Sequence, residues 1–484
     1  MSLSGALSNA LSGLNAASRS SQVTASNLSN ATTPGYGRRE VELGANGLGS
    51  HGGVTVLGTT RHMNPGLLSE VRLASAARAG SDETAKFHDR LESLIGLPSD
   101  PASLGAKITR FESALVEAAS RPDLTERLGA VLQSAEDLAS GFKQVSDGIQ
   151  SMRGEADRKI ASDVDSLNTL LSQVRDINRQ ITVSTVNGRD SSALEDQRQV
   201  MIDSIAEIVP VKETKRELGA VALFTSGGAI LLDGTAARVE FSATNMTAPH
   251  MTQAGGELSG LSINGRQVAT DAEGGPMHGG RLGALFEFRD EIAPKIQTRV
   301  DATARDLVER FESAGLDATR TAGDPGLFTD GGAAFAPGDE TGLSGRLALN
   351  DAVVPENGGA LWRLRDGLGA ADPGPVGNGT LLRDMASALS EGRTPASGAF
   401  GPGKLSAAGL QSGLLDQISN DRNASELEQS FAAARFDSAN SQLLAEGVDS
   451  DQEMQRLMEI EQAYAANARL LQTVGEMFDA LIRI

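Results

Sequence analysis

Near its C-terminal end the chain reads LMEIEQAYAANARLLQTVGEMFDAL, residues 457–481. Residues that can pack against a neighbouring helix recur in this stretch at alternating steps of three and four, which is the heptad pattern of a coiled coil. The pattern predicts one helix that begins at a capping box of Ser450 and Glu453. Its stripe consists of Leu457, Ile460, Tyr464, Asn467, Leu471, Val474, Phe478 and Leu481.

Residues 1–30 carry the same alternation, at Leu3, Leu7, Ala10, Leu14, Ala17, Ser21, Thr24 and Leu28. An amphipathic helix leaves its apolar face in water unless a second element covers it. Because both ends of the chain carry such a stripe, we expect the two terminal helices to pair as a coiled coil. Asn467 in the C-terminal stripe is expected to fix the register of the pairing, as a single buried Asn commonly does. The alternative is an exposed Asn in an imperfect stripe.

Long helices are also predicted between the termini. From Leu124 to Ile181 the helical periodicity hardly pauses, which indicates a rod of roughly 85 Å at 1.5 Å per residue. A further helix is expected to begin after Asp100 as N-cap, with Pro101 at its first position. Another is expected to begin at a capping box of Ser192 and Glu195 and to end before Pro210. A third is expected from Arg281 to Glu312, with a kink at Pro294.

After Pro210 the period changes from helical to strand-like, with short apolar runs divided by Gly-Gly and Asp-Gly turn pairs. The predicted fold class is therefore mainly α with inserted β: terminal helices pairing as a coiled coil, a bundle of long helices and an outer β-rich domain. We expect four units. They are the terminal coiled coil (1–60 plus 447–484), the helical bundle (61–210 plus 281–315 plus 405–446), the inserted β-rich domain (211–280) and a Gly/Pro-rich loop or small β region (316–404).

Composition excludes several classes of function. A net charge of -20 would repel both nucleic-acid phosphates and anionic lipid, so we expect no nucleic-acid partner. The chain has no cysteine, which removes disulfide, thiolate and zinc-thiolate chemistry. No run of about 18 apolar residues predicts membrane insertion, and residues 1–30 lack the features of a cleavable signal peptide.

Two short motifs match nucleotide-binding patterns only in part. Gly398 to Lys404 has the spacing of a phosphate loop, but Leu405 stands where Ser or Thr must hold magnesium. Gly47, Gly49 and Gly52 have dinucleotide-binding spacing, but a strand-like run follows them instead of a helix, which indicates a Gly-rich turn. The five histidines show no metal-ligand spacing. We therefore expect no enzyme activity, no cofactor, no metal and no catalytic residue.

Both ends of the chain resemble one known family. Ala10 to Ala17 (ALSGLNAA), Ala25 to Ala31 (ASNLSNA) and Thr33 to Arg38 (TPGYGR) are similar to the N-terminal signature of the flagellar rod, hook and hook-associated proteins. Glu461 to Ala468 (EQAYAANA) and the final LIRI are similar to the C-terminal signature. The resemblance is nearest to the hook-filament junction subfamily, FlgK.

This resemblance implies a structural subunit of the bacterial flagellum, located outside the cell and exported by the flagellar type III route. The implied partners are the hook protein, the second hook-filament junction protein, copies of the chain in a helical ring, and a cytoplasmic export chaperone that binds the C-terminal helix. The subunit-interface residues are then expected to be Leu3, Leu7, Leu14, Leu28, Tyr36, Leu457, Ile460, Tyr464, Asn467, Leu471, Val474, Phe478 and Leu481. For Tyr36, packing within its own domain is an equal alternative.

Two other functions remain open at this stage. Another axial protein, a hook or distal-rod subunit, shares the Thr-Pro-Gly-Tyr turn, although the long rod from Leu124 to Ile181 argues against it. A secreted adhesin could use the β insertion to bind glycans, but the insertion contains no Trp or Tyr for stacking.

Overall fold

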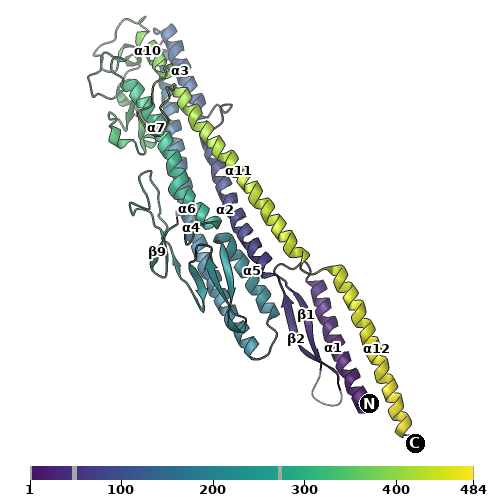
Figure 1. The fold of residues 1–484 in the computed structure, drawn as a ribbon. Helices are drawn as coiled ribbons and strands as arrows, with labels where there is room; N and C mark the ends of the chain where they lie inside the picture. Colours follow the sequence, from purple (N-terminus) through teal and green to yellow (C-terminus); the bar gives the residue numbers. More distant parts are fainter. Residues whose placement is uncertain (1–2, 46–51, 271–274, 483–484) are drawn as a thin grey trace.

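The molecule is long and narrow, and both chain termini lie at the same end (Figure 1). This computed structural model describes residues 3–45, 52–270 and 275–482, so Gly47 and Gly49 of the predicted Gly-rich turn lie outside the described residues. The main helices are α1 (Leu3–Ser29), α2 (Pro65–Ile95), α3 (Leu104–Ser120), α4 (Thr125–Val186), α5 (Ser192–Ile208), α6 (Gly280–Glu287), α7 (Ala293–Glu312), α10 (Thr380–Ser390), α11 (Ala407–Ala445) and α12 (Ser450–Ile482). Two single-turn helices are α8 (Leu343–Arg346) and α9 (Arg363–Asp366).

Short strands complete the fold. They are β1 (Arg38–Ala45), β2 (Val54–His62), β3 (Val211–Lys215), β4 (Val221–Thr225), β5 (Ile230–Asp233), β6 (Thr235–Ala236), β7 (Val239–Glu240), β8 (Leu261–Ile263), β9 (Arg266–Val268), β10 (Phe328–Asp330) and β11 (Leu347–Leu349). Every described pairing between them is antiparallel. The architecture confirms the predicted class, mainly α with inserted β.

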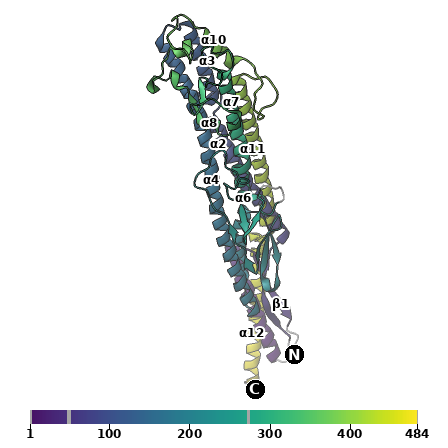
Figure 2. The same cartoon turned by 90° about the vertical axis from the view of Figure 1, so that its left-hand side faces the viewer.

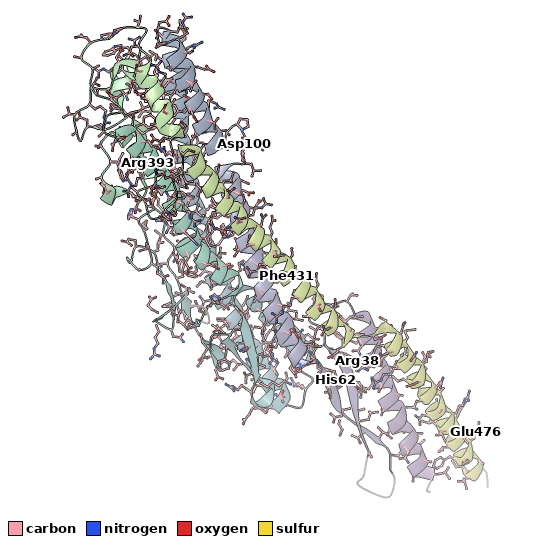
Figure 3. The ribbon with its side chains drawn as sticks, turned by 45° about the horizontal axis from the view of Figure 1, so that its top comes forward. Arg38, His62, Asp100, Arg393, Phe431 and Glu476 are labelled. Atoms are coloured by element: carbon pink, nitrogen blue, oxygen red, sulfur yellow. The ribbon has the colours of Figure 1, made fainter. Side chains whose placement is uncertain are left out.

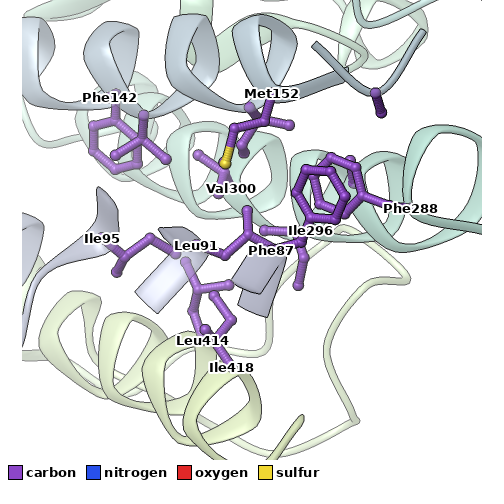
Figure 4. Close-up of a cluster of buried hydrophobic side chains, with 14 of the residues drawn as sticks. Phe87, Leu91, Ile95, Phe142, Met152, Phe288, Ile296, Val300, Leu414 and Ile418 are labelled. Carbon is purple, nitrogen blue, oxygen red and sulfur yellow. The ribbon is translucent and has the colours of Figure 1, made fainter. Parts of the chain in front are cut away.

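The bundle is built around α4, which has 62 residues and is therefore about 93 Å long. Helices α2 and α7 pack against it, and α11 packs on α2 (Figures 1 and 2). Figure 4 shows the core between them, where Phe87 of α2 stacks on Phe288 with ring centroids 3.7 Å apart. Leu91 of α2 and Leu414 of α11 are completely buried in the same cluster. The predicted rod is thus confirmed as the spine of the molecule.

The joint between α6 and α7 is a π-helical turn, Phe288–Ile292, shortly before Pro294. Proline has no amide hydrogen to donate, and a π turn accommodates the resulting gap in the hydrogen-bond ladder. Arg289 in this turn forms a completely buried ion pair with Asp157 of α4, at 2.6 Å. In place of the predicted kink at Pro294 the chain forms a π-helical turn, and the ion pair between Arg289 and Asp157 attaches this turn to α4.

The β insertion forms two small sheets, of order β3-β4-β5-β6 and β7-β8-β9, that pack beside α4 and α5. Leu223 and Leu232 pair across β4 and β5 and are both completely buried. Because these short strands bury their apolar face on the spine, the sheets depend on the helices for their core.

Two local expectations are corrected. Helix α3 begins at Leu104 with Ser103 as its N-cap, not at Asp100, because the Asp100 carboxylate accepts the Ala102 amide (2.8 Å) in a turn before the helix. The Gly/Pro-rich stretch also contains the helix α10, which packs on α3 and was not predicted. No described helix has the length and apolar character needed to cross a membrane.

Candidate assembly site at the paired terminal helices

Helices α1 and α12 lie side by side beyond the end of the bundle, and the hairpin β1-β2 covers another side of α1 (Figures 1 and 2). The two helices run antiparallel, since Asn27 contacts Glu453 near one end and Gly13 lies against Asn467 further along. The surface between α1 and α12 is called the seam below. This arrangement matches the predicted pairing of the terminal helices.

At Gly13 the seam has room for a side chain only if Asn467 moves. A Cβ atom placed on Gly13 would lie 2.7 Å from Nδ2 of Asn467, closer than real contacts allow. The Asn467 amide donates to the Ala463 carbonyl of its own helix (3.0 Å). Asn467 is half-buried and meets the seam by packing over Gly13, so its register role stays a prediction.

Helix α12 is capped by Asp449, whose Oδ1 accepts the backbone amides of Asp451 (2.9 Å) and Gln452 (3.1 Å). The predicted capping box of Ser450 and Glu453 is therefore wrong. Glu453 does not fold back on its own helix start, because its carboxylate points into the seam and finds stronger donors there.

Glu453 is the polar centre of the seam and is only 1% exposed. Its Oε1 accepts from Arg38 Nε at 2.8 Å, and its Oε2 accepts from Asn27 Nδ2 at 3.0 Å. A buried carboxylate is tolerated only when charged or polar donors satisfy it. Glu453 therefore joins the start of α12 to both the end of α1 and the start of β1.

The turn Thr33 to Tyr36 brings these donors together. The Tyr36 amide donates to the Thr33 carbonyl (3.2 Å), and Gly35 has φ +76°, as a turn of type II requires at its third position. The Tyr36 hydroxyl donates to Oδ1 of Asn27 (2.9 Å), which also accepts the Arg39 amide. In this molecule Tyr36 thus takes the intradomain role that the sequence left as an alternative.

A second polar cluster joins the terminal unit, which consists of α1, the hairpin β1-β2 and α12, to the bundle. Asp196 of α5 accepts from the Gly37 amide (3.0 Å), Arg39 Nη2 (2.5 Å) and Arg61 Nε (2.7 Å). A Cβ atom on Gly35 would lie 2.6 Å from Val200 of the same helix, so the turn approaches α5 closely. Asp196 therefore holds three parts of the terminal unit with a single carboxylate.

A third ionic contact lies beside the seam, where Arg456 of α12 donates to Glu40 of β1. The hydrogen bond from Arg456 lowers the pKa of Glu40, and the nearby charges of Arg38 and His62 act in the same direction. Glu40 remains charged at neutral pH and adds a second link between α12 and the hairpin.

The expected interface residues fall into two groups. Val474 is buried, and a half-buried group faces inward: Leu3, Leu7, Leu14, Leu28, Tyr36, Leu457, Ile460, Asn467 and Leu471. Tyr464, Phe478 and Leu481 are exposed. The seam within one molecule therefore uses only part of the predicted stripe.

Helix α12 also exposes apolar side chains that the heptad analysis missed. Leu470 is 55% exposed, and Met454, Met458, Met477 and Ile482 are exposed as well. Neighbouring Leu470 and Leu471 could have signalled this second surface, because adjacent side chains on a helix point about 100° apart. Exposed apolar side chains at several positions of one helix favour burial against a partner protein.

The described residues contain no group of histidines and carboxylates that could hold a metal ion. The polar clusters at Glu453 and Asp196 have their oxygens occupied by arginine and amide donors, which suits a structural role. Both carboxylates therefore hold together segments that are distant in the sequence.

Comparison with known proteins identifies the family. Residues 88–328 match the model of the flagellar hook-associated protein FlgK helical domain. Residues 7–36 match the flagella basal body rod protein model, and residues 441–484 match the C-terminal model of flagellar basal body rod FlgEFG proteins. The chain belongs to the FlgK family of flagellar hook-associated proteins.

Similar proteins cover the whole chain. Flagellar hook-associated protein 1 of Escherichia coli is 24% identical over 100% of this chain and 100% of its own length. Flagellar hook-associated protein 1 of Bacillus subtilis is 21% identical over 95% of this chain and 94% of its own. The structure of the flagellar hook junction protein FlgK from Burkholderia pseudomallei aligns with a TM-score of 0.45 and 18% identity, over 55% of this chain and 47% of that one.

Proposed function

We propose that this chain is a structural subunit of the bacterial flagellum that forms the junction between hook and filament and is needed for filament assembly. The observation that carries the proposal is the family match over residues 88–328, which contains the whole of α4. The long rod was the feature that argued against a hook or distal-rod subunit. Full-length similarity to proteins named flagellar hook-associated protein 1 supports the same function.

We further propose that the terminal unit is the surface through which the subunit joins its neighbours in the axial structure: the hook protein, the second junction protein and copies of itself. The exposed residues of α12, Tyr464, Leu470, Met477, Phe478 and Leu481, support this role, because water-exposed apolar side chains favour burial against a partner. The residues of the seam would then hold the two helices in the geometry that neighbours recognise.

We propose a separate role for each of the four units predicted from the sequence. Residues 1–60 with 447–484 would face neighbouring subunits, and 61–210 with 281–315 and 405–446 would form the rigid spacer. Residues 211–280 and 316–404 would face outward. The placement of the two small sheets on one side of α4, away from α12, supports the outward assignment.

Export through the flagellar type III route and protection of α12 by a cytoplasmic chaperone complete the proposal. An amphipathic helix docks into a chaperone groove by its apolar face. The exposed apolar residues of α12 supply such a face. We propose that chaperone and neighbouring subunits use the same residues in succession.

The test uses a flagellated strain whose own junction gene is deleted and which expresses this chain. We expect the parent chain to restore filaments on the hooks. The Leu470→Asp variant should leave bare hooks, because its carboxylate would have to be buried against a neighbour. The Gln472→Asp variant adds the same charge at another exposed position of α12 and should assemble like the parent.

Secretion and folding are measured beside filament growth. Both variants should show the circular dichroism and melting temperature of the parent, since neither residue is buried. The proposed function is wrong if the exported parent chain restores no filaments, and the proposed surface is wrong if the Leu470 variant grows them normally.

A further inference from the structure

A hollow of about 520 Å³ lies between the segment before α3, the first half of α3 and the first turns of α11. Its walls carry mostly small or apolar residues, among them Gly96, Pro98, Gly105, Ala106, Ala408 and Leu415. Most side chains of this lining are small, so the hollow can receive one from another molecule.

Gln411 lines this hollow and has an unsatisfied hydrogen-bonding atom. The residue is 4% exposed, and its Oε1 has no hydrogen-bond partner among the described residues. Buried acceptors are normally paired, so an unpaired one marks a place where a donor is missing.

A matching protrusion lies further along α11. Phe431 is 67% exposed, and Leu427, one turn before it, is exposed as well. Figure 3 labels Phe431 on α11, well below Asp100, which lies in the segment before α3. A large aromatic ring in water is an unfavourable arrangement that burial in a partner would relieve.

The protrusion and the hollow are placed for a repeating contact. Along α11, Gln411 and Phe431 are separated by about 30 Å at 1.5 Å per residue, and the intervening turns bring them to opposite sides of the helix. A patch on one side of a molecule that fits a different patch on the other side generates rings or helical assemblies. Such a contact suits a subunit that repeats around an axis.

The charges beside the two patches are complementary. Arg110 lines the hollow, and its Nη2 donates to the Pro101 carbonyl (3.2 Å). Glu428 precedes Phe431 by about one turn and is exposed. Within the described residues neither of them forms an ion pair. Glu428 lies near Glu287 and its charge raises the pKa of that carboxyl, so a cation from a neighbouring copy would be favourable there.

We propose that Phe431 and Leu427 of one copy of this chain insert into the hollow between α3 and α11 of the next copy, with Glu428 facing Arg110. This contact lies in the bundle, separate from the terminal helices, and it rests on the proposed function as a repeating axial subunit. It is a lateral contact that fixes the axial shift between neighbours at about 30 Å.

Cysteine pairs test the contact directly, because the chain contains no cysteine of its own. Ser412 lines the hollow, and Ser430 lies next to Phe431; both are exposed. Within one molecule these positions are about 27 Å apart along α11, far beyond the roughly 7 Å Cα separation that a disulfide spans. A disulfide in the Ser412→Cys, Ser430→Cys variant must therefore join two copies.

We expect oxidation to give a ladder of linked copies, both in flagella isolated from the complemented strain and in the concentrated purified chain. The control pair Ser412→Cys, Ser441→Cys should give none, since exposed Ser441 lies about 15 Å beyond Phe431 on α11. Absence of the ladder from both preparations would overturn the proposal, as would equal ladders from the two pairs.

Charge exchange provides the second test, read in the background of the Ser412→Cys, Ser430→Cys variant. The single changes Arg110→Glu and Glu428→Arg should each reduce linking at least threefold, and the double exchange should restore it. Failure of the double exchange to restore linking would overturn the contact between Arg110 and Glu428. If the parent chain restores no filaments, the proposed junction function is wrong. Oxidative linking of the purified cysteine variant then still tests whether two copies make the proposed contact.

Discussion

The Glu453 carboxylate accepts a hydrogen bond of 3.0 Å from the Asn27 carboxamide, across the seam between the last and first helices of the chain. The same carboxylate accepts from Arg38 at 2.8 Å. One side chain therefore holds together three segments that are far apart in the sequence.

The Glu453→Ala variant should release the start of α12 from the seam. Removing one partner of a buried ion pair leaves the others unsatisfied, and we expect a loss of about 3 kcal/mol in the free energy that docks α12. Hydrogen exchange should show faster exchange of α12 amides, with little change in those of α4. The exposed Glu459→Ala change on the same helix is the control and should leave α12 protected. Unchanged exchange in the Glu453 variant would contradict this role.

The close approach at Gly13 gives a second prediction. The Gly13→Val change should push Asn467 aside and separate the paired helices, at a cost of about 1–3 kcal/mol as for other overpacked sites. The double variant with Asn467→Ala should recover most of the loss, because the space is returned. Thermal unfolding of the terminal unit, monitored by the hydrogen exchange of its amides, measures both the loss of stability and its recovery.

A matched glycine on the other helix provides the control for this prediction. A Cβ on Gly475 of α12 would meet nothing within 4 Å, so Gly475→Ala should be neutral or stabilise the helix by about 0.5–1 kcal/mol. If Gly13→Val proves as harmless as Gly475→Ala, the seam is not packed as closely as the structure has it.

Periodicity predicted α1, α4 and α12 because their stripes depend only on residues a few positions apart. The role of Glu453 could not be predicted in this way. Its acidic side chain three residues after Ser450 fits a capping box equally well, and the donors that draw it inward, Asn27 and Arg38, lie at the other end of the chain. Local sequence favours the cap, whereas tertiary contacts decide the outcome.

The helix α10 was missed for a related reason. Its buried residues Leu382, Met385 and Leu389 follow a helical stripe, but the stripe is only three turns long and lies in a Gly/Pro-rich stretch. Such a helix forms because α3 covers its apolar face, and the sequence of α10 alone does not contain that information.

The attachment of α12 to the hairpin should weaken in acid. The hydrogen bond from Arg456 lowers the pKa of Glu40 from its ordinary value of 4.5, so the contact is complete above that value and is lost as the pH falls through the lowered pKa of the folded state. Exchange rates in the first turns of α12, corrected for the intrinsic rate, should be constant near neutrality and should rise below pH 4.5.

The Arg456→Gln variant is the comparison for this pH dependence. It removes the charge that lowers the pKa of Glu40. The exchange rates in the first turns of α12 should therefore depend less on pH in this variant than in the parent. Identical profiles for the two proteins would show that other carboxylates control the acid response.

The Asp196 carboxylate should control how the terminal unit is held on the bundle. Its three donors, the Gly37 amide, Arg39 and Arg61, come from the turn and both hairpin strands, so Asp196→Ala removes all of these contacts at once. We expect the bundle to keep its melting temperature, since its core lies between α2, α4, α7 and α11. Small-angle scattering should instead show a broader distribution of maximum dimensions, because the terminal unit can change its angle to α4.

The exposed Glu207→Ala change lies on the same helix and removes the same kind of charge without touching the hairpin. It should scatter like the parent. A subunit whose ends meet neighbours while its bundle spaces them must present both parts at one fixed angle, so loss of the Asp196 contacts should also reduce filament growth in the deletion strain. If the Asp196 variant keeps the parent's scattering curve, the angle is fixed by the packing of Gly35 against Val200, and combining Asp196→Ala with Val200→Ala should then release it.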